Sequence, residues 1–474
     1  MPYDDLREYL TVLERSGKLH RVCKEVDPAW EVAALARVVF QKIPDNKRPA
    51  LYFENVKGSS IPIVGGGLGA SREIYALALE TSLDGIADKW TEAQSHPIRP
   101  EVVSRGVCQE NILLGDEVDV FKFPVPVWTV EHDPGPYLTA PFIVSKDPET
   151  GIPNVGTYRV QLKEKNKLGC MVNFLQHLRR HVEMNNALDR PTPVAIVMGT
   201  DPTIGLTSVS KVPYGVNEFS VAGGLRGEPV KLVKCITSDL EVPATAEIVI
   251  EGEIPPNHLE HEGPFGEYTG YMGPDGGAYV VNVKCITHRH NPVLQVFFSQ
   301  MPPSESSVIR GFGREAAIYK HLVEDLRLPV EDVRLKESGG SASYLAISIR
   351  KEHPTQAREV AWGAWSLDPT FGKFTVVVDS DIDIRDDFAL DWALSFRVQP
   401  SRDCYIIPDT PSVRLDPSVA PADEPQLTRR RQTASKLFID ATMKHKYPPL
   451  AMPPRDHLEK VASSLELYGF KSNG

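Results

Sequence analysis

The sequence predicts a mixed α/β protein of about three domains. Its 474 residues exceed the ~300 that one hydrophobic core usually supports, and a typical domain has ~150. The composition, 41% hydrophobic and 24% charged, is that of a globular protein. Helical and strand-like patterns alternate at both ends of the chain, whereas the middle reads mainly as strands. We therefore expect an α/β domain at each end and a β-rich domain between them.

The N-terminal region alternates helices and strands. Its predicted elements are a helix from Asp4 or Asp5 to Gly17, a helix at 31–41, strands at 51–53 and 61–64, and a helix at 73–79. The loop at 65–70, G-G-G-L-G-A, matches the looser dinucleotide fingerprint G-x-G-x-x-A. Three consecutive glycines satisfy such a pattern easily, and no βαβ unit follows. We therefore expect a turn without a ligand.

The rest of the chain divides into a β-rich part and a second α/β part. The predicted strands of the β-rich part are 154–162, 194–198, 230–237, 246–253, 279–287 and 293–298, with a helix at 174–184. A helix at 307–326 leads to the second part, with strands at 344–350 and 374–379 and helices at 355–364 and 388–396. A proline-rich tether and an apolar-striped helix at 455–468 end the chain.

Charge and composition exclude several classes of protein. The net charge of 52 − 63 = −11 argues against a nucleic-acid binder that neutralises phosphates. The N-terminus has no signal-peptide pattern, and no apolar run reaches the ~18 residues of a membrane span. The six cysteines are scattered without a C-x-x-C pair, which favours free thiols. We expect a cytoplasmic protein that binds no nucleic acid and has no membrane span.

Two carboxylates lie close together in the segment 262–271, E-G-P-F-G-E-Y-T-G-Y. Glycine and proline hold such a turn rigidly and close to a ligand. Two carboxylates that share a site raise the pKa of one of them. Glu262 and Glu267 could therefore include a proton donor that works near neutral pH. A solvated loop is the alternative.

Asn154 and Arg159 lie on one predicted strand. Their opposite parity places them on opposite faces of a regular strand. A bulge at Gly156 would bring both toward one site. An arginine beside the carboxylate pair would favour the ionised form of one carboxylate and could hold an anionic substrate. An ordinary surface strand is the alternative.

His177 and His181 are spaced i, i+4 on one predicted helix face. The spacing is that of a zinc protease, but Leu178 stands where the general-base glutamate should be, which excludes that class. One histidine could still bind a harder ion together with carboxylate and amide oxygens. Glu218, which follows a turn, could supply such an oxygen. A plain surface histidine is the alternative.

Taken together, these motifs resemble the UbiD family of reversible decarboxylases, which use prenylated flavin mononucleotide (prenylated FMN). The matching motifs are N-x4-R at 154–159, Q-H at 176–177, V-N-E-F-S-V-A-G-G-L-R-G at 216–227, E-G-P-F-G-E at 262–267 and D-S-D-I-D-I at 379–384. The spacings 177 − 159 = 18 and 262 − 218 = 44 also resemble the family pattern. The match spans nearly the whole chain.

The resemblance implies a particular division into domains. It places an N-terminal α/β domain at 1–105, a central split β-barrel that binds the flavin at 106–305, and a linker helix at 306–328. A C-terminal α/β oligomerisation domain follows at 329–442, and a tether with a C-terminal helix occupies 443–474.

The resemblance also implies the site residues. A divalent ion, usually Mn²⁺, would bridge the protein to the cofactor phosphate through three ligands, Asn154, His177 and Glu218. The implied catalytic set is Arg159, Glu262 and Glu267. The implied cofactor-binding residues are Asn154, Thr157, Tyr158, Arg159, Gln176, His177, Ser208, Glu218 and Lys373. Lys373 would contact the phosphate, and Ser208 the phosphate or a monovalent ion such as K⁺.

The implied chemistry is coherent. Loss of CO₂ from an sp² carbon is difficult, because the electrons left behind need an electron sink. No side chain offers such a sink, so a cofactor must supply it. In this family the prenylated flavin forms a covalent adduct with the substrate, and CO₂ departs. A proton must then reach the carbon that lost CO₂, and we expect Glu267 to donate it, with Arg159 and Glu262 orienting it.

Two other functions compete with this interpretation. A split-barrel FMN oxidoreductase would turn over NAD(P)H and need no prenyltransferase, but the metal set beside the phosphate argues against it. A non-catalytic subunit of a carboxylase complex would be expected to lack one of the three catalytic residues, and all three are present.

The substrate is defined only as a class. An aromatic, heteroaromatic or α,β-unsaturated carboxylic acid fits, and Tyr268 beside Glu267 modestly favours a flat ring. The expected partners are this acid with CO₂, a UbiX-type prenyltransferase that supplies the cofactor, and further copies of the chain in a homodimer or larger homo-oligomer.

Overall fold

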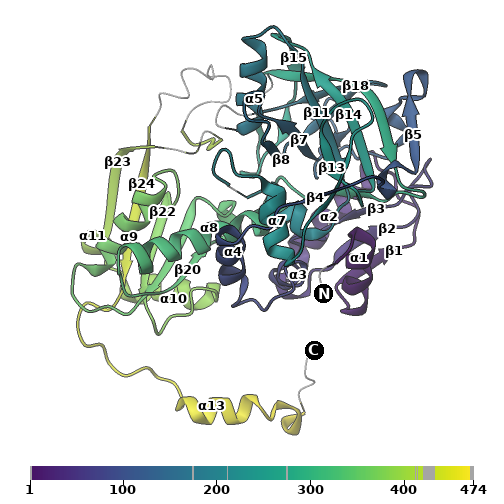
Figure 1. Cartoon of the computed structure of the whole chain (residues 1–474). Helices are drawn as coiled ribbons and strands as arrows, with labels where there is room; N and C mark the ends of the chain where they lie inside the picture. The colour runs from purple at the N-terminus through teal and green to yellow at the C-terminus, as the bar shows by residue number, and fades with distance from the viewer. Residues whose placement is uncertain are drawn as a thin grey trace.

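The computed structural model describes residues 3–172, 176–210, 212–273, 276–411, 413, 415–419 and 433–469. Within these residues, sheets of four, ten and five strands form three mixed α/β parts, accompanied by small sheets of three and two strands. Figure 1 shows the ten-stranded sheet and the N-terminal helices on one side and the five-stranded sheet on the other. The order of these parts along the chain is the one that the sequence predicts.

The N-terminal part packs helices on a four-stranded sheet. Its first helix, α1 (Leu6–Arg15), begins where Asp5 accepts a hydrogen bond from the Glu8 N–H, and it buries the predicted leucine face. The other helices are α2 (Glu31–Lys42), α3 (Arg72–Ala78) and α4 (Ile86–Ser95). The sheet has the order β1 (Leu19–Val22), β2 (Ala50–Phe53), β3 (Ile63–Gly65) and β19 (Leu294–Val296).

Strand β19 corrects one sequence expectation. The predicted strand at 293–298 was grouped with the central β-rich region. The structure instead pairs β19 in parallel with β3, with Leu294 opposite Ile63. Because β19 is buried, its apolar pattern fits either sheet, and only the tertiary fold decides which one it joins. The chain therefore returns to the N-terminal sheet after completing the central one.

The central part is built on a ten-stranded antiparallel sheet. Eight strands follow the order β6 (Tyr137–Leu138), β9 (Val160–Glu164), β10 (Lys167–Cys170), β18 (Gly276–His288), β14 (Ile248–Ile254), β11 (Thr192–Met198), β7 (Phe142–Lys146) and β8 (Pro153–Thr157). Two further strands, β5 (Asn111–Leu114) and β15 (Leu259–Glu262), also pair with β18.

The predicted strand 154–162 is two strands, β8 and β9, and this break closes the sheet on itself. Strand β8 lies at one end of the sheet order and β9 is the second strand from the other end, yet only Tyr158 and Arg159 separate them along the chain. Three Cα steps span at most about 10 Å. The two ends of the sheet must therefore curl together, as in a barrel with a seam. The expected bulge at Gly156 is wrong, since Gly156 keeps its regular pairing with Ile143.

Three helices and two small sheets surround the central sheet. Helix α5 (His177–Asn186) contacts β7, β8 and β11, whereas α6 (Pro202–Ser208) and α7 (Glu218–Arg226) contact β8. The start of the predicted helix 174–184 lies outside the described residues. The small sheets are β13 (Glu241–Pro243), β12 (Lys231–Lys234) and β4 (Glu101–Val103), and β16 (Phe265–Gly266) with β17 (Met272–Gly273).

The C-terminal part is a sheet covered on both faces. Helix α8 (Glu305–Lys320) continues into a π turn at His321–Asp325 and leads into it. The sheet has the order β20 (Val330–Leu335), β21 (Tyr344–Ile349), β22 (Phe374–Asp379), β24 (Ala434–Ala441) and β23 (Cys404–Thr410), with β21, β22 and β24 parallel. Helix α9 (Gln356–Leu367) and helix α10 (Asp387–Arg397) contribute to separate apolar clusters against it.

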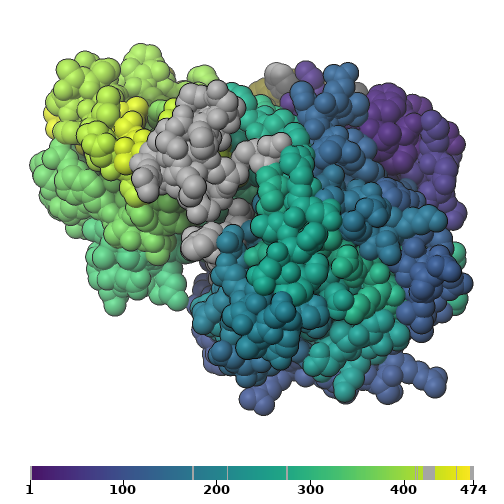
Figure 2. Space-filling model, turned by 90° about the horizontal axis from the view of Figure 1, so that it is seen from above, coloured from purple at the N-terminus to yellow at the C-terminus, as the bar shows by residue number. Residues whose placement is uncertain are grey.

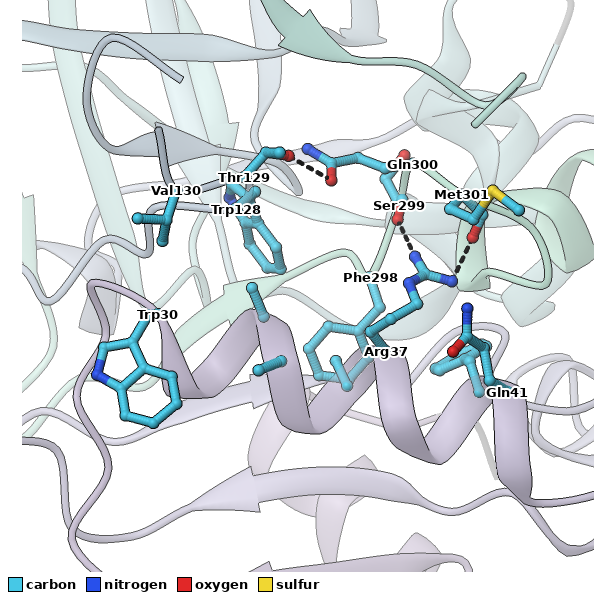
Figure 3. Close-up of a pocket in the computed structure, with 14 residues that line it drawn as sticks. Trp30, Arg37, Gln41, Trp128, Thr129, Val130, Phe298, Ser299, Gln300 and Met301 are labelled. Atoms are coloured by element: carbon cyan, nitrogen blue, oxygen red, sulfur yellow. Dashed lines mark hydrogen bonds between the residues drawn. The ribbon is translucent and has the colours of Figure 1, made fainter. Parts of the chain in front are cut away.

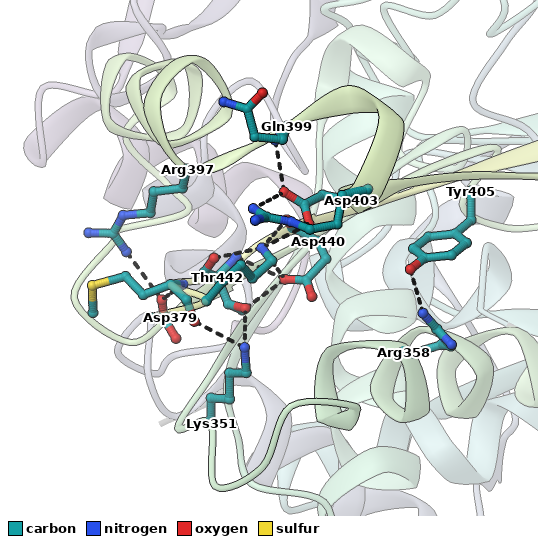
Figure 4. A network of polar contacts seen from close by, with 12 residues as sticks. Lys351, Arg358, Asp379, Arg397, Gln399, Asp403, Tyr405, Asp440 and Thr442 are labelled. Carbon is teal, nitrogen blue, oxygen red and sulfur yellow. Dashed lines mark hydrogen bonds and ion pairs between the residues drawn. The ribbon is translucent and has the colours of Figure 1, made fainter. Parts of the chain in front are cut away.

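A polar network fastens the strand ends of this C-terminal part. Asp381 accepts two hydrogen bonds from Arg397 at 2.8 and 2.6 Å, and Asp379 accepts a third at 3.3 Å. Asp379 also accepts the Met443 N–H, and Lys351 donates to the Thr442 hydroxyl (Figure 4). The aspartates of the D-S-D-I-D-I motif therefore tie α10 and the end of β24 to β22, which is a structural role.

The last helix lies apart from the three sheets. Helix α13 (Arg455–Ala462) follows an extended segment that carries it away from the rest of the molecule (Figure 1). A short 3₁₀ turn at Leu465–Tyr468 follows it, and the predicted apolar stripe is exposed along both. No helix in the described part of the chain is long and apolar enough to span a bilayer. Viewed from above, the C-terminal part in green and yellow lies beside the blue and teal central part (Figure 2).

A buried carboxylate at the start of α8 joins three segments. Glu305 accepts backbone N–H groups from Gly66 at 2.8 Å, Leu68 at 3.0 Å and Phe298 at 3.0 Å. Burial raises the pKa of Glu305 to about 7. The donors at Gly66 and Leu68 belong to the glycine-rich loop, so an internal carboxylate takes the N–H groups that a phosphate would use in a dinucleotide site.

We predict that Glu305→Ala destabilises the protein strongly. The substitution leaves three buried N–H groups unpaired, at ~1–3 kcal/mol each, so we expect a loss of about 3 kcal/mol or more. Urea unfolding measures this, with Glu324→Ala as a control because Glu324 is exposed on the turn that continues α8. The control should stay within about 0.5 kcal/mol of the wild type. Equal midpoints for both variants would contradict the role of Glu305.

Candidate active site

The three predicted catalytic residues meet in one ion-pair cluster. Arg159 donates from Nε to Glu262 Oε1 at 3.0 Å and from Nη2 to Glu262 Oε2 at 2.8 Å. Its third donor, Nη1, binds Glu267 Oε1 at 2.7 Å. The first contact is a two-point pair of fixed geometry, whereas the second is a single bond. The arginine therefore holds one carboxylate rigidly and leaves the other an unshared oxygen, Oε2.

The two carboxylates differ in their access to ligand. Glu262 has no exposed side-chain surface, whereas 24% of the Glu267 side chain is exposed. Burial raises the pKa of Glu267, and the charges of Arg159 and Arg310 oppose that effect only in part. A carboxyl group with a raised pKa and an accessible oxygen is suited to proton transfer near neutrality.

The local fold explains how the carboxylates reach the arginine. Glu262 ends β15, which pairs with β18, and Arg159 lies at the seam between β8 and β9. Glu267 opens a tight turn in which its N–H donates to the Tyr271 carbonyl at 2.8 Å. Across the turn, a Cβ on Gly273 would lie 2.8 Å from Glu267 Cγ. Only glycine leaves room there for the glutamate side chain.

The structure also gathers the three predicted metal ligands around β8. Asn154 lies on β8, His177 is the first residue of α5 and Glu218 the first of α7, and both helices contact β8. Glu218 Oε2 accepts the Val155 N–H at 3.0 Å, which places the carboxylate beside Asn154 in the chain. The fold therefore converges on the predicted ligand set.

Burial shifts the pKa values of two of these side chains. Burial raises the pKa of Glu218 to about 7, and hydrogen bonds from its own N–H and that of Val155 oppose this in part. Burial lowers the pKa of His177, which keeps its imidazole neutral, as a metal ligand must be. Behind it, Tyr214 packs edge-on against His177 and hydrogen-bonds Asp147. Sequence reasoning did not give Tyr214 a role.

The predicted ligands fit a hard divalent ion. Glu218 is a buried carboxylate that pairs with no cation among the described residues. Amide, imidazole and carboxylate ligands together suit ions such as Mn²⁺. No three His, Cys, Asp or Glu side chains of the described residues group as a metal site. The predicted ligand set contributes one histidine and one glutamate to such a group, because its third member, Asn154, is an amide.

The remaining predicted cofactor contacts lie near the same strand, except Lys373. The Thr157 and Ser208 hydroxyls are 2.8 Å apart, so β8 and α6 meet there. The Tyr158 ring covers Gly156, where a Cβ would lie 2.6 Å from the hydroxyl oxygen. Gln176 directly precedes α5.

Lys373 lies in the C-terminal part, beyond the central sheet. It donates to Asp416 at 2.8 Å and to Ser418 at 2.5 Å. With Tyr268, the residue after Glu267, it lines a cavity of about 290 Å³. The cavity joins the catalytic turn to the C-terminal sheet. A phosphate contact by Lys373 stays a prediction.

Sequence reasoning missed one charged residue beside the cluster. Arg310 on α8 places its guanidinium carbon 4.2 Å from the centre of the Tyr268 ring. Its charge acts on Glu267, and its buried Nη1 atom has no hydrogen-bond partner among the described residues. No motif marks Arg310, because only the packing of α8 against the turn brings it there.

A second, larger cavity lies behind the catalytic turn. It has a volume of about 730 Å³ and is bordered by α2 and the segment 298–301, with Trp30 and Trp128 on its wall. Arg37 crosses it to donate to the Ser299 carbonyl at 2.9 Å (Figure 3). Gln300 separates it from the turn, where a Cβ on Gly266 would lie 2.5 Å from the Gln300 side chain. None of the predicted site residues line it.

Comparison with known families now identifies the class of protein. Residues 10–94, 101–302 and 307–441 match the N-terminal, Rift-related and C-terminal domains of 3-octaprenyl-4-hydroxybenzoate carboxy-lyase. Together these three domains cover most of the chain and define a three-domain carboxy-lyase. The chain belongs to the UbiD family.

Individual relatives support this membership. The uncharacterized protein sll0936 of Synechocystis sp. is 35% identical over 445 residues, which cover 87% of this chain and 86% of that protein. The UbiD-class enzyme HmfF from Pelotomaculum thermopropionicum, solved with FMN, is 35% identical with a TM-score of 0.86, over 96% of this chain and 98% of that chain. Vanillic acid decarboxylase from Sedimentibacter hydroxybenzoicus is 30% identical with a TM-score of 0.86, over 99% and 100%.

These findings establish the enzyme class. The chain is a UbiD-type carboxy-lyase with the UbiD fold. HmfF has also been solved in an evolved dimeric form with prenylated FMN, at 34% identity, a TM-score of 0.83 and coverage of 96% and 98%. HmfF has therefore been solved with FMN and, in the evolved form, with prenylated FMN.

Proposed function

We propose that the protein catalyses the non-oxidative, reversible decarboxylation of an aromatic, heteroaromatic or α,β-unsaturated carboxylic acid, with Glu267 as the proton donor. One observation carries the proposal: Arg159 holds two carboxylates at once, one buried and one partly exposed. The buried partner fixes the arginine, and the exposed partner keeps a free oxygen. This is an arrangement for delivering a proton to a defined point.

Each residue of the cluster has a separate task. Glu262 binds Arg159 through two oxygens and fixes its plane. Arg159 orients Glu267 through Oε1, so the transferable proton sits on Oε2. Burial keeps the pKa of Glu267 raised, which supports a protonated state. In the forward direction Glu267 gives this proton to the carbon that has lost CO₂, and in the reverse direction it removes a proton from that carbon.

The cofactor site includes the residues around β8. Asn154, His177 and Glu218 would hold a divalent ion such as Mn²⁺ beside the phosphate, and Thr157, Tyr158, Gln176 and Ser208 would line the same site. Ser208 would also contact a monovalent ion such as K⁺. When bound, prenylated FMN supplies the electron sink that no side chain offers. The buried Glu218 carboxylate, which binds the N–H of the residue after Asn154, supports this assignment.

The wider context follows from the same proposal. A UbiX-type prenyltransferase would supply the cofactor, and the chain would form a homodimer or larger homo-oligomer. The exposed apolar stripe of α13 supports self-association. The free cysteines of the described chain fit a reducing cytoplasm.

We predict that activity depends on the prenylated cofactor. The enzyme should be expressed with and without a UbiX-type prenyltransferase and then screened against aromatic, heteroaromatic and cinnamic-type acids for CO₂ release. Only the co-expressed protein should release CO₂, because FMN alone lacks the modified ring. Full activity with FMN alone, or NAD(P)H turnover, would instead support a flavin oxidoreductase.

We predict that His177→Ala and Glu218→Ala each lose metal and flavin together. One ion is proposed to join both side chains to the phosphate, so removing a ligand leaves phosphate charge uncompensated. Elemental analysis and flavin absorbance measure the two losses. The control is His258→Ala, because His258 is exposed and pairs with Glu260, which is not one of the proposed ligands. Unchanged metal and flavin in both variants would show that the site is misassigned.

We predict that Glu267→Gln keeps the cofactor but loses decarboxylation. Glutamine preserves the shape but has no transferable proton, and such groups contribute ~10²–10⁴-fold in rate. Proton exchange at the product carbon, followed by NMR in D₂O, should slow by a similar factor. Glu260→Gln is the matched control. Glu260 lies on β15 together with Glu262, but it pairs with Lys163 instead of Arg159.

Glu262→Gln tests the division of roles within the pair. We expect partial activity, because the amide weakens the hold on Arg159 without removing the donor. If Glu262→Gln were inactive and Glu267→Gln were active, Glu262 would be the proton donor and Glu267 the residue that fixes Arg159. If both Glu262→Gln and Glu267→Gln stayed active, proton donation by this carboxylate pair would be wrong.

A further inference from the structure

Tyr214 contacts both helix α5 and the loop between β7 and β8. Its ring meets the His177 imidazole at an angle of 87°, with 5.1 Å between the ring centres. It also meets the ring of His181, one turn further along α5, at 70° and 5.9 Å. The guanidinium carbon of Arg180 lies 3.9 Å from the centre of the tyrosine ring. Three side chains of α5 therefore pack on one tyrosine.

The hydroxyl of Tyr214 is held as well as its ring. It donates to Asp147 Oδ2, whereas Asp147 Oδ1 accepts the N–H groups of Glu149 and Thr150, each at 2.9 Å. Asp147 lies in the loop between β7 and β8 and is only 5% exposed. A buried carboxylate is stable only when it is hydrogen-bonded. The bond therefore ties Tyr214 firmly to the hairpin whose second strand carries Asn154.

The segment that carries Tyr214 leads directly into α7. Gly215, at a φ of +84°, turns the chain after the tyrosine, and Glu218 begins α7 three residues later. Tyr214 thus contacts or adjoins three segments, and each of them supplies one predicted metal ligand. The hairpin supplies Asn154, α5 supplies His177 and α7 supplies Glu218. The same tyrosine can therefore fix all three segments relative to one another.

His181, the second histidine of the i, i+4 pair, fastens α5 to the central sheet. Its Nδ1 atom lies 2.9 Å from the Ser145 hydroxyl on β7. Both side chains are buried, with 2% of His181 and none of Ser145 exposed. This contact holds the helix one turn beyond His177, but it does not restrict the rotation of the His177 ring. The perpendicular ring of Tyr214 supplies that restriction.

We propose that Tyr214 is a positioning residue for the divalent-ion site, and that its bond to Asp147 holds the three ligands at fixed positions relative to one another. The proposal rests on the proposed function, in which Asn154, His177 and Glu218 bind the ion, and adds a residue that acts through them. His177 begins α5, and helix ends fray. A ligand that is already held in place loses less conformational entropy on binding.

Manganese binding by the full chain tests this role without turnover. The protein is stripped of metal with a chelator, saturated with FMN and titrated with Mn²⁺, and the EPR signal of the free ion gives the dissociation constant. Tyr214→Leu should raise this constant ~10–100-fold, the range typical of residues that orient a metal ligand. The EPR spectrum of the bound ion should also change, because it reports the ligand geometry. Tyr214→Phe keeps the ring but loses the bond to Asp147, so it should restore only part of the affinity.

A buried tyrosine in the N-terminal part provides the control. Tyr75→Phe removes a hydroxyl that accepts the Trp90 Nε1–H at 2.9 Å. It should lower the urea midpoint without changing the dissociation constant for Mn²⁺. An equal rise of that constant in Tyr214→Leu and Tyr75→Phe would overturn the proposal, because the affinity would then follow overall stability. If Tyr214→Leu does not fold, wild-type affinity in Tyr214→Phe would overturn it.

His177→Ala separates this proposal from the proposed function. A raised dissociation constant in His177→Ala beside an unchanged one in Tyr214→Leu would overturn the role of Tyr214 and leave the ligand assignment standing. Equal Mn²⁺ binding by the wild type and His177→Ala would overturn both. Weaker binding in both His177→Ala and Tyr214→Leu, with partial recovery in Tyr214→Phe, is the expected result.

Discussion

The two-residue link between β8 and β9 is the constraint on which the site depends. It ties β8, at one end of the sheet order, to β9, the second strand from the other end, so the sheet must curl and leave a seam. Tyr158 and Arg159 have left the strand pairing at this seam, which frees the arginine to bind Glu262 and Glu267. Asn154 remains on β8 five residues earlier. The proposed metal ligand and the proposed proton-transfer arginine therefore occupy one short piece of chain, at most about 17 Å apart along it.

Helix α8 extends this constraint to the other two parts of the molecule. At its first residue, Glu305 binds backbone N–H groups of the N-terminal loop and of the segment after β19. Five residues on, Arg310 lies against Tyr268 in the catalytic turn. Glu305 is buried and accepts backbone N–H groups, so these hydrogen bonds fix the start of the helix away from solvent. The position of Arg310 thus depends on Glu305, the carboxylate that fixes the first turn of α8 against the N-terminal part.

The balance between burial and pairing sets the chemistry of the site. Glu262 is fully buried and is held at two points by Arg159, which fixes its position. Glu267 has one bond to the same arginine, and burial raises its pKa. Two identical side chains acquire different roles because one guanidinium cannot offer both the same geometry. Glu218 is similar, because it is a buried carboxylate whose hydrogen-bond donors among the described residues are backbone N–H groups.

The sequence by itself determined the fold class, the order of the parts and the local elements, because hydrophobic periodicity and caps such as Asp5 act over a few residues. The ordered motifs also marked Arg159, Glu262 and Glu267, which the structure brings together. Tertiary structure decided where β19 pairs, where the strand 154–162 breaks, and that Arg310 faces Tyr268. These depend on sheet closure and helix packing between segments more than 40 residues apart (310 − 268 = 42), and no local pattern encodes such contacts.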